Sequence, residues 1–331
     1  MKILINGVGR SGTSFLTETI REIVYQEKKI EPYCIYEPFL WGEAVWNIDY
    51  MKENHLYEKM SSISYEGVFN HLTLPLYIND PEKFTDNTYL RKILNMSEIN
   101  IIKFVRGLGR IKLLHAMEPT AKHIFIIRNP IDNMNSVISH GSLLGEEWHR
   151  NDDKRMYREL KEMNYKTNKN DESSLFEKEL DWWYSMNEFY LKETSKLDID
   201  ILYLTYENLI KDFESSIKKI CNHLEINFSQ NFLNLLNKQR GSRSSNNFLN
   251  RENLDSCSNY MNKYENLIKT YNIECDVNLN EVHKKYNKLN KKEYDRSNIG
   301  LTPTFTKKKM KEKQFISRIK YLIRTFKNII R

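Results

Sequence analysis

The chain has 331 residues, enough for one large hydrophobic core, and its aromatic content of 12% argues against disorder over most of its length. The formal net charge of +7 is concentrated in residues 307–331, where ten basic residues stand against one acid, and residues 1–306 are close to neutral. This distribution argues against a nucleic-acid-binding surface over the body of the protein, so no nucleic-acid partner is expected.

The cysteines and histidines indicate no metal site. The four cysteines form no C-x-x-C pair and the eight histidines do not cluster, so reduced thiols in a cytoplasmic protein are expected. No apolar run approaches the roughly 18 residues that span a bilayer. The chain begins with a strand-like segment in place of a basic and then apolar leader, so a secretory signal is not expected.

The first 28 residues predict a strand, a glycine-rich turn and a helix. Lys2–Asn6 is an apolar run typical of a buried strand, and apolar residues recur at helical spacing from Phe15 to Lys28. The turn between them reads G-V-G-R-S-G-T-S. Glycines allow a backbone to wrap closely around an anion, and a helix N-terminus supplies unpaired N–H groups. This stretch therefore predicts a phosphate-binding loop, with an ordinary strand–helix turn as the alternative.

The loop lacks the lysine of a nucleoside triphosphate site. Gly7 and Gly12 have the G-x-x-x-x-G spacing, but Thr13 stands where that motif has lysine, and the positive charge is Arg10. Such a loop is poorly suited to a γ-phosphate with Mg²⁺. It suits a single phosphate-like group held by backbone N–H groups, by Arg10 and by the hydroxyls of Ser11, Thr13 and Ser14.

Strands and helices alternate from residue 2 to residue 224. Further strands are predicted at 33–37, 100–105, 122–128 and 198–206, with helices at 108–117, 130–138, 175–197 and 207–224. This alternation predicts an α/β fold with three layers, α/β/α, around a central parallel sheet. Two predicted strands end in charged residues, Glu37 and Arg128, at the edge where such sheets bind ligands.

The chain is expected to divide at residue 285. Residues 1–285 are predicted to form the α/β domain, with a charged excursion or lid at 150–174, and residues 286–331 a Lys/Asn-rich linker followed by a basic amphipathic helix. That helix suits peripheral contact with the inner face of an anionic membrane, or alternatively docking on its own domain.

Four blocks of sequence resemble the sulfotransferases that use 3′-phosphoadenosine 5′-phosphosulfate (PAPS). G-V-G-R-S-G-T-S resembles their 5′-phosphosulfate loop, and F-I-I-R-N-P-I-D-N-M-N-S resembles their 3′-phosphate motif. I-L-Y-L-T-Y-E-N-L resembles the block whose second tyrosine approaches the adenine. Y-E-P-F-L-W is similar to a segment of the carbohydrate sulfotransferases, and K-F-V-R at 103–106 to their next strand.

The resemblance implies PAPS as co-substrate, with no metal, and a set of binding residues. The loop residues that it assigns to the phosphosulfate are Gly9, Arg10, Ser11, Gly12, Thr13 and Ser14. It places Arg128 and Ser136 on the 3′-phosphate and Tyr206 beside the adenine. Only Arg240 and Gly241 match the R-K-G triplet that completes the cofactor site in the soluble enzymes, and the histidine base of those enzymes is not found.

Glu37 is our expected general base for the acceptor hydroxyl, with Arg10 and Lys103 as further catalytic residues. Lys103 is expected to support the bridging oxygen or to pair with Glu37. Glu37 as an acceptor-binding carboxylate, and His115 or His140 as the base, remain alternatives. The predicted acceptor is a carbohydrate or glycolipid hydroxyl. A P-loop kinase of small molecules and a non-catalytic PAPS- or PAP-binding protein are the competing hypotheses.

Overall fold

The computed structural model describes residues 1–36, 91, 94–105, 107–139, 165, 173–239, 249, 251–278, 281, 282, 284 and 286. Within them, five parallel strands form one sheet in the order β2-β3-β1-β4-β5. The strands are β1 (Lys2–Asn6), β2 (Tyr33–Tyr36), β3 (Asn100–Phe104), β4 (Lys122–Ile127) and β5 (Ile201–Thr205).

The central strand, β1, determines where the site lies. After β1 the chain runs to β2 on one side, and after β4 it runs to β5 on the other, although β1 and β4 are neighbours. In open parallel sheets ligands bind beyond the carboxyl ends of two strands whose connections diverge in this way. The residues that follow Asn6 and Ile127 therefore lie at the expected binding edge.

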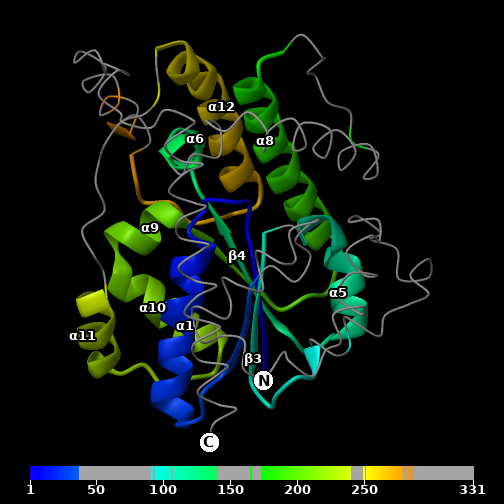
Figure 1. The fold of residues 1–331 in the computed structure, drawn as a ribbon, viewed down its shortest axis with the longest axis vertical. Helices are drawn as coiled ribbons and strands as arrows, with labels where there is room; N and C mark the ends of the chain where they lie inside the picture. The colour runs from blue at the N-terminus through cyan, green and yellow to red at the C-terminus, as the bar shows by residue number, and fades with distance from the viewer. Residues whose placement is uncertain are drawn as a thin grey trace, which may run out of the picture.

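Among the described residues, the helices on one face of the sheet are α1 (Thr13–Lys28), α9 (Tyr206–Lys211), α10 (Phe213–His223) and α11 (Gln230–Gln239). Successive strand residues point to opposite faces, so Ile3 and Ile5 face these helices while Leu4 faces away. Figure 1 shows this layer beside the sheet, with α1 closest to the central strands.

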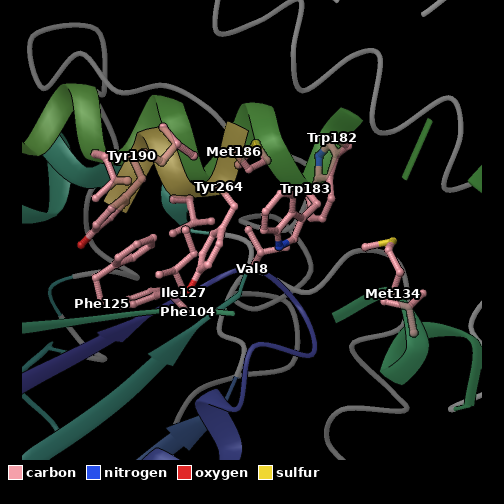
Figure 2. Packing of buried hydrophobic residues seen from close by; sticks show 14 of the residues in the cluster. Val8, Phe104, Phe125, Ile127, Met134, Trp182, Trp183, Met186, Tyr190 and Tyr264 are labelled. Carbon is pink, nitrogen blue, oxygen red and sulfur yellow. The ribbon is translucent and has the colours of Figure 1, made fainter. Parts of the chain in front are cut away.

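The opposite face is covered by α5 (Ile111–Met117), α6 (Pro130–Ser139), α8 (Leu175–Thr194) and α12 (Arg251–Thr270), and a single 3₁₀ turn, η2 (Leu108–Arg110), precedes α5. Aromatic side chains fill this core, and Figure 2 shows them between α8, α12 and the sheet. Phe125 stacks on Tyr190 with ring centroids 4.5 Å apart. The predicted three-layer α/β/α fold with a parallel sheet is thus confirmed.

The predicted helix over 207–224 is two helices. Asp212 ends α9 and caps α10, because its carboxylate accepts the amide of Ser215 at 3.2 Å. Tyr286 is buried and belongs to the core on the α6, α8 and α12 side of the sheet, so packed chain includes residue 286 as well. The predicted excursion at 150–174 and the predicted linker and tail at 286–331 lie outside the described residues, apart from Tyr165, Ser173, Ser174 and Tyr286.

Candidate functional site

The segment between β1 and α1 is a tight loop, residues 7–12, at the carboxyl edge of the sheet. The amide of Gly7 donates to the carbonyl of Phe104 at 3.3 Å, which ties the loop to the end of β3. A Cβ on Gly7 would lie 2.6 Å from the carbonyl oxygen of Ile126, so only glycine fits against β4. The loop is therefore held across the ends of both neighbouring strands.

Two residues of this loop have left-handed backbone conformations, Arg10 at φ 67° and Gly12 at φ 96°. Glycine adopts such angles without steric cost, whereas a residue with a Cβ loses roughly 1–2 kcal/mol. Strain of this kind persists where surrounding contacts enforce it, and it gathers at functional sites. Here the enforcing contact comes from Arg128, whose Nη1 donates to the carbonyl of Arg10 at 3.0 Å.

The N-terminus of α1 faces the same edge. Its first hydrogen bond runs from the Leu16 amide to the Gly12 carbonyl, and no side chain caps the helix start. The amides of Thr13 and Ser14 precede that bond and so have no acceptor within the helix. With the positive end of the dipole of this 16-residue helix, they form a suitable site for an anion.

Arg128 follows directly after β4, so its side chain projects from the sheet edge beside the loop. Its guanidinium carbon lies 4.2 Å from the centroid of the Tyr206 ring, which orients the guanidinium plane. Among the described residues, its buried Nε has no hydrogen-bond partner. A buried N–H donor without a partner is costly, so this atom identifies a place where an anion would be stabilised.

Helix α6 is joined to the loop by polar contacts. The Nε of Arg10 donates to the Ser136 hydroxyl at 3.2 Å. One turn earlier on the helix, the Nδ2 of Asn133 donates to the carbonyl of Gly9 at 3.1 Å and to the Ser11 hydroxyl at 3.3 Å. The structure thus brings Arg10, Arg128 and Ser136 together, as their positions after β1 and β4 predicted.

Tyr206 lies over the end of the loop. It begins α9 directly after β5, and its ring packs against Gly12 so closely that a Cβ there would lie 2.4 Å from Cδ2 of the ring. Tyr206 therefore contacts both Gly12 of the loop and Arg128, so it links the loop to the end of β4.

Lys103 lies near the end of β3 and points to the start of α1. Its Nζ donates to the Ser14 hydroxyl at 3.0 Å, and the lysine is buried. A further cation is thus fixed at the N-terminus of α1. The predicted partner of Lys103, Glu37, lies outside the described residues, as do His140, Arg240 and Gly241.

Three residues that the sequence analysis does not single out hold the site together: Asn129, Asn133 and Glu207. Asn129 caps α6, because its Oδ1 accepts the Asp132 amide at 2.9 Å and Pro130 follows at the first helical position. Asn-Pro directly after a strand was the signal available for this cap. Asn133 and Glu207 act through contacts between distant elements, for which a single sequence carries no local signal.

The alternative base His115 lies elsewhere in the fold. It is on α5, and it interacts electrostatically with His123 near the start of β4, whereas the loop lies beside the end of that strand. Within the described part of the chain, no group of His, Cys, Asp or Glu side chains is arranged to hold a metal ion.

Comparison with known proteins identifies the family. The sequence model of the sulfotransferase domain matches residues 1–298, whereas a search of curated proteins finds no significant match. Similar solved structures include a sulfotransferase from Alicyclobacillus acidocaldarius, with 13% identity, a TM-score of 0.43, and 83% of this chain and 96% of that chain covered. The mouse sulfotransferase SULT7A1 complexed with PAP has 13% identity and a TM-score of 0.40, with 86% and 88% covered. Because the domain match spans residues 1–298, the chain belongs to the sulfotransferase family, which confirms the resemblance in its sequence.

Proposed function

We propose that this sulfotransferase moves a sulfuryl group in line from PAPS to a hydroxyl of a carbohydrate or glycolipid acceptor, without a metal ion. The observation that carries the proposal is the pair of anion-binding elements side by side at one sheet edge. One is the glycine loop with the N-terminus of α1, and the other is Arg128 with Ser136.

The described residues fit the chemical groups of PAPS. The loop amides, Arg10 and the hydroxyls of Thr13 and Ser14 would hold the 5′-phosphosulfate, as the loop resemblance implies. The buried Nε of Arg128, which lacks a partner among the described residues, would donate to the 3′-phosphate together with the hydroxyl of Ser136. The ring of Tyr206 would pack against the adenine.

PAPS supplies an activated sulfuryl group, and the protein's own residues would supply orientation and charge. A sulfuryl group carries less negative charge than a phosphoryl group, so fixed cations and dipoles can stabilise the leaving phosphate. Arg10 in the loop before α1 and Lys103 beside Ser14 are such cations, and their hydrogen bonds to Ser136 and Ser14 hold them in place. Preorganised groups of this kind stabilise developing charge without reorganising during the reaction.

Glu37 follows the last residue of β2 in the chain and is the proposed base for the acceptor hydroxyl. β2 pairs with β3 in parallel, so its carboxyl end lies at the same edge as Lys103. The Y-E-P-F-L-W segment supports a sugar-bearing acceptor through its similarity to the carbohydrate sulfotransferases. Glu37→Gln is expected to abolish turnover while leaving PAP affinity unchanged, and near-normal turnover would exclude Glu37 as the base.

A thermal-shift measurement in EDTA with PAP, AMP and ATP tests the proposed co-substrate. A ligand at 100 times its dissociation constant stabilises a protein by about 2.7 kcal/mol, a shift that is readily measured. Stabilisation by PAP that is lost in Arg128→Ala would support the proposal. Stabilisation by ATP that requires Mg²⁺, with none by PAP, would favour a kinase. PAP binding without turnover on any acceptor pool would favour a non-catalytic binding protein.

The basic tail supports a location at the inner membrane face of the cytoplasm. Residues 307–331 combine an apolar stripe with ten basic residues, a pattern typical of helices that lie on anionic membranes. Among the described residues, no helix is long and apolar enough to cross a bilayer. Deletion of 307–331 is expected to abolish binding to anionic liposomes, and unchanged binding would exclude the membrane role.

A further inference from the structure

Two neighbouring residues of α9 contact two neighbouring residues after β4: Tyr206 contacts Arg128, and Glu207 contacts Asn129. Tyr206 stacks on the Arg128 guanidinium, as described above. The neighbouring Glu207 accepts the backbone amide of Asn129 at 2.9 Å and its side-chain Nδ2 at 2.5 Å, both through Oε1. The backbone that carries Arg128 is therefore fixed on its inner side by a carboxylate.

Glu207 is buried, with 7% of its surface exposed, and burial raises the pKa of its carboxyl group. Its second oxygen, Oε2, accepts the hydroxyl of Tyr264 on α12 at 3.1 Å. A buried carboxyl group costs stability unless its oxygens are hydrogen-bonded. These donors satisfy both oxygens, so the carboxylate is held between β4 and α12 in one position.

The contact continues through Asn129 into α6. Asn129 caps this helix, and its Nδ2 also donates to the Asp132 carboxylate at 2.7 Å. The same carboxylate accepts the hydroxyl of Tyr286 at 2.6 Å. Helix α6 carries Ser136, so the Glu207–Asn129 contact fixes both the strand end that bears Arg128 and the helix that bears Ser136.

We propose that Glu207 is a positioning residue for the 3′-phosphate of the co-substrate, acting through Asn129 on Arg128 and Ser136. The inference rests on the proposed function, because it assumes that these two residues bind that phosphate. It assigns to Glu207 no contact with the ligand. Its effect is therefore expected to be larger on the 3′-phosphate, which Arg128 and Ser136 would bind directly, than on the 5′ side, where these two residues contact only Arg10 of the loop.

Isothermal titration calorimetry with PAP and with AMP, which lacks only the 3′-phosphate, provides the test. The affinity for PAP divided by the affinity for AMP, called the PAP/AMP ratio, measures the contribution of that phosphate. Glu207→Ala is expected to reduce the ratio by about tenfold, the size of one lost hydrogen bond to a charged group. Glu207→Gln retains an oxygen that accepts from Asn129, so it is expected to restore the ratio. A change in overall stability alone would not alter this ratio.

A matched control exists on the same helix. Tyr260, one turn before Tyr264 on α12, donates to the buried carboxylate of Asp181 on α8 at 3.0 Å. Asp181→Ala removes a comparable buried contact that does not involve Asn129. It is expected to lower the thermal unfolding midpoint and to leave the PAP/AMP ratio unchanged.

Arg128→Ala separates failure of this inference from failure of the proposed function. If Arg128→Ala lowers the ratio and folded Glu207→Ala does not, the positioning role is wrong and the 3′-phosphate site stands. If wild-type protein does not prefer PAP, both are wrong. If both single variants lower the ratio, the double variant is expected to lose less than the two single losses combined, because Glu207 acts partly through Arg128; fully additive losses would contradict the inference.

If Glu207→Ala does not fold, a milder variant, Asn129→Ser, tests the same proposal. Asn129→Ser keeps a helix-capping oxygen but loses the Nδ2 contact with Glu207. It is expected to lower the PAP/AMP ratio as well, and an unchanged ratio in this folded variant would overturn the proposal.

Discussion

The ring of Tyr206 lies against the backbone of Gly12, with no room between them for a methyl group: a Cβ on the glycine would lie 2.4 Å from Cδ2 of the ring. Gly12 also has φ 96°, an angle that side chains rarely adopt. The loop and the tyrosine are thus fitted to each other at a position where only glycine satisfies both constraints.

Gly12→Ala is expected to weaken PAP binding by tenfold or more and to lower the unfolding midpoint. The unfavourable φ costs about 1 kcal/mol, and the Cβ must displace Tyr206 from Arg128. Calorimetry and thermal unfolding would measure both effects. Gly9→Ala is the control, because its Cβ would make an ordinary contact, 3.5 Å from Val105 Cγ1. Equal behaviour of the two variants would contradict the prediction.

Two substitutions of Tyr206 are expected to distinguish the contribution of its ring to PAP affinity from that of its hydroxyl. A cation–π contact contributes about 0.5–2 kcal/mol, so Tyr206→Ala should weaken PAP binding severalfold or more, while Tyr206→Phe retains the ring and the affinity. Phe228→Ala, which removes a ring 5.1 Å from Lys218 Nζ, controls for loss of an aromatic contact elsewhere. A loss in the Phe variant equal to that in the Ala variant would show that the stacking is not responsible.

Lys103→Met is expected to lower kcat by roughly a hundredfold, as for other groups that stabilise developing charge, with little change in PAP affinity. The physical reason is the loss of the cation fixed on Ser14 at the helix N-terminus. Turnover and PAP titration would be compared with Lys122→Met. Lys122 begins β4 at the opposite edge, where it pairs with Asp200, so that variant should keep its kcat. If PAP affinity falls and kcat does not, Lys103 serves binding alone.

The buried His123 is expected to make the fold acid-sensitive. Burial lowers the pKa of its imidazole to about 3, with smaller contributions from His115 and His223 and an opposing one from Asp200. The folded state therefore binds fewer protons than the unfolded state, so stability is fully present above pH 6.5 and is lost as the pH falls toward 3. The loss from one such group approaches about 1.4 kcal/mol per pH unit.

Chemical denaturation of wild type and His123→Leu between pH 7 and 5 tests this dependence. The variant should lose less stability over this range than the wild type. His223→Gln controls for the neighbouring histidine, whose pKa burial also lowers, and it should keep the part of the dependence that belongs to His123. Parallel curves for wild type and His123→Leu would exclude this histidine as the cause.

The sequence predicted those parts of the site that come from one segment each. The glycine loop lies on a strand–turn–helix unit, and Arg128 and Ser136 lie on the next such unit, where local patterns determine both structure and place. Their meeting could be inferred because carboxyl ends of parallel strands share an edge. The Arg10–Ser136 and Arg128–Tyr206 contacts lie at that edge.

The residues missed are those whose role exists only after the elements have packed. Glu207 stands beside Tyr206 in the sequence, and nothing in Y-E-N-L indicates that its carboxylate reaches Asn129, 78 positions earlier. The break at Asp212 was missed because the apolar spacing continues through it, whereas its side chain caps the next helix. The roles of Glu37, Arg240 and Gly241 stay predictions.

The sheet order also determines when each strand can find its partners during synthesis. β1 is synthesised first, yet its partners, β3 and β4, begin at Asn100 and Lys122. At roughly 5–20 residues per second, β1 of the nascent chain waits for seconds without a neighbouring strand to pair with. Nor is the glycine loop held in its left-handed geometry during that interval, because the Arg128 contact that enforces it has not yet been made. The binding loop, which precedes β3 and β4 in the sequence, thus takes its working shape only after Arg128 has been synthesised.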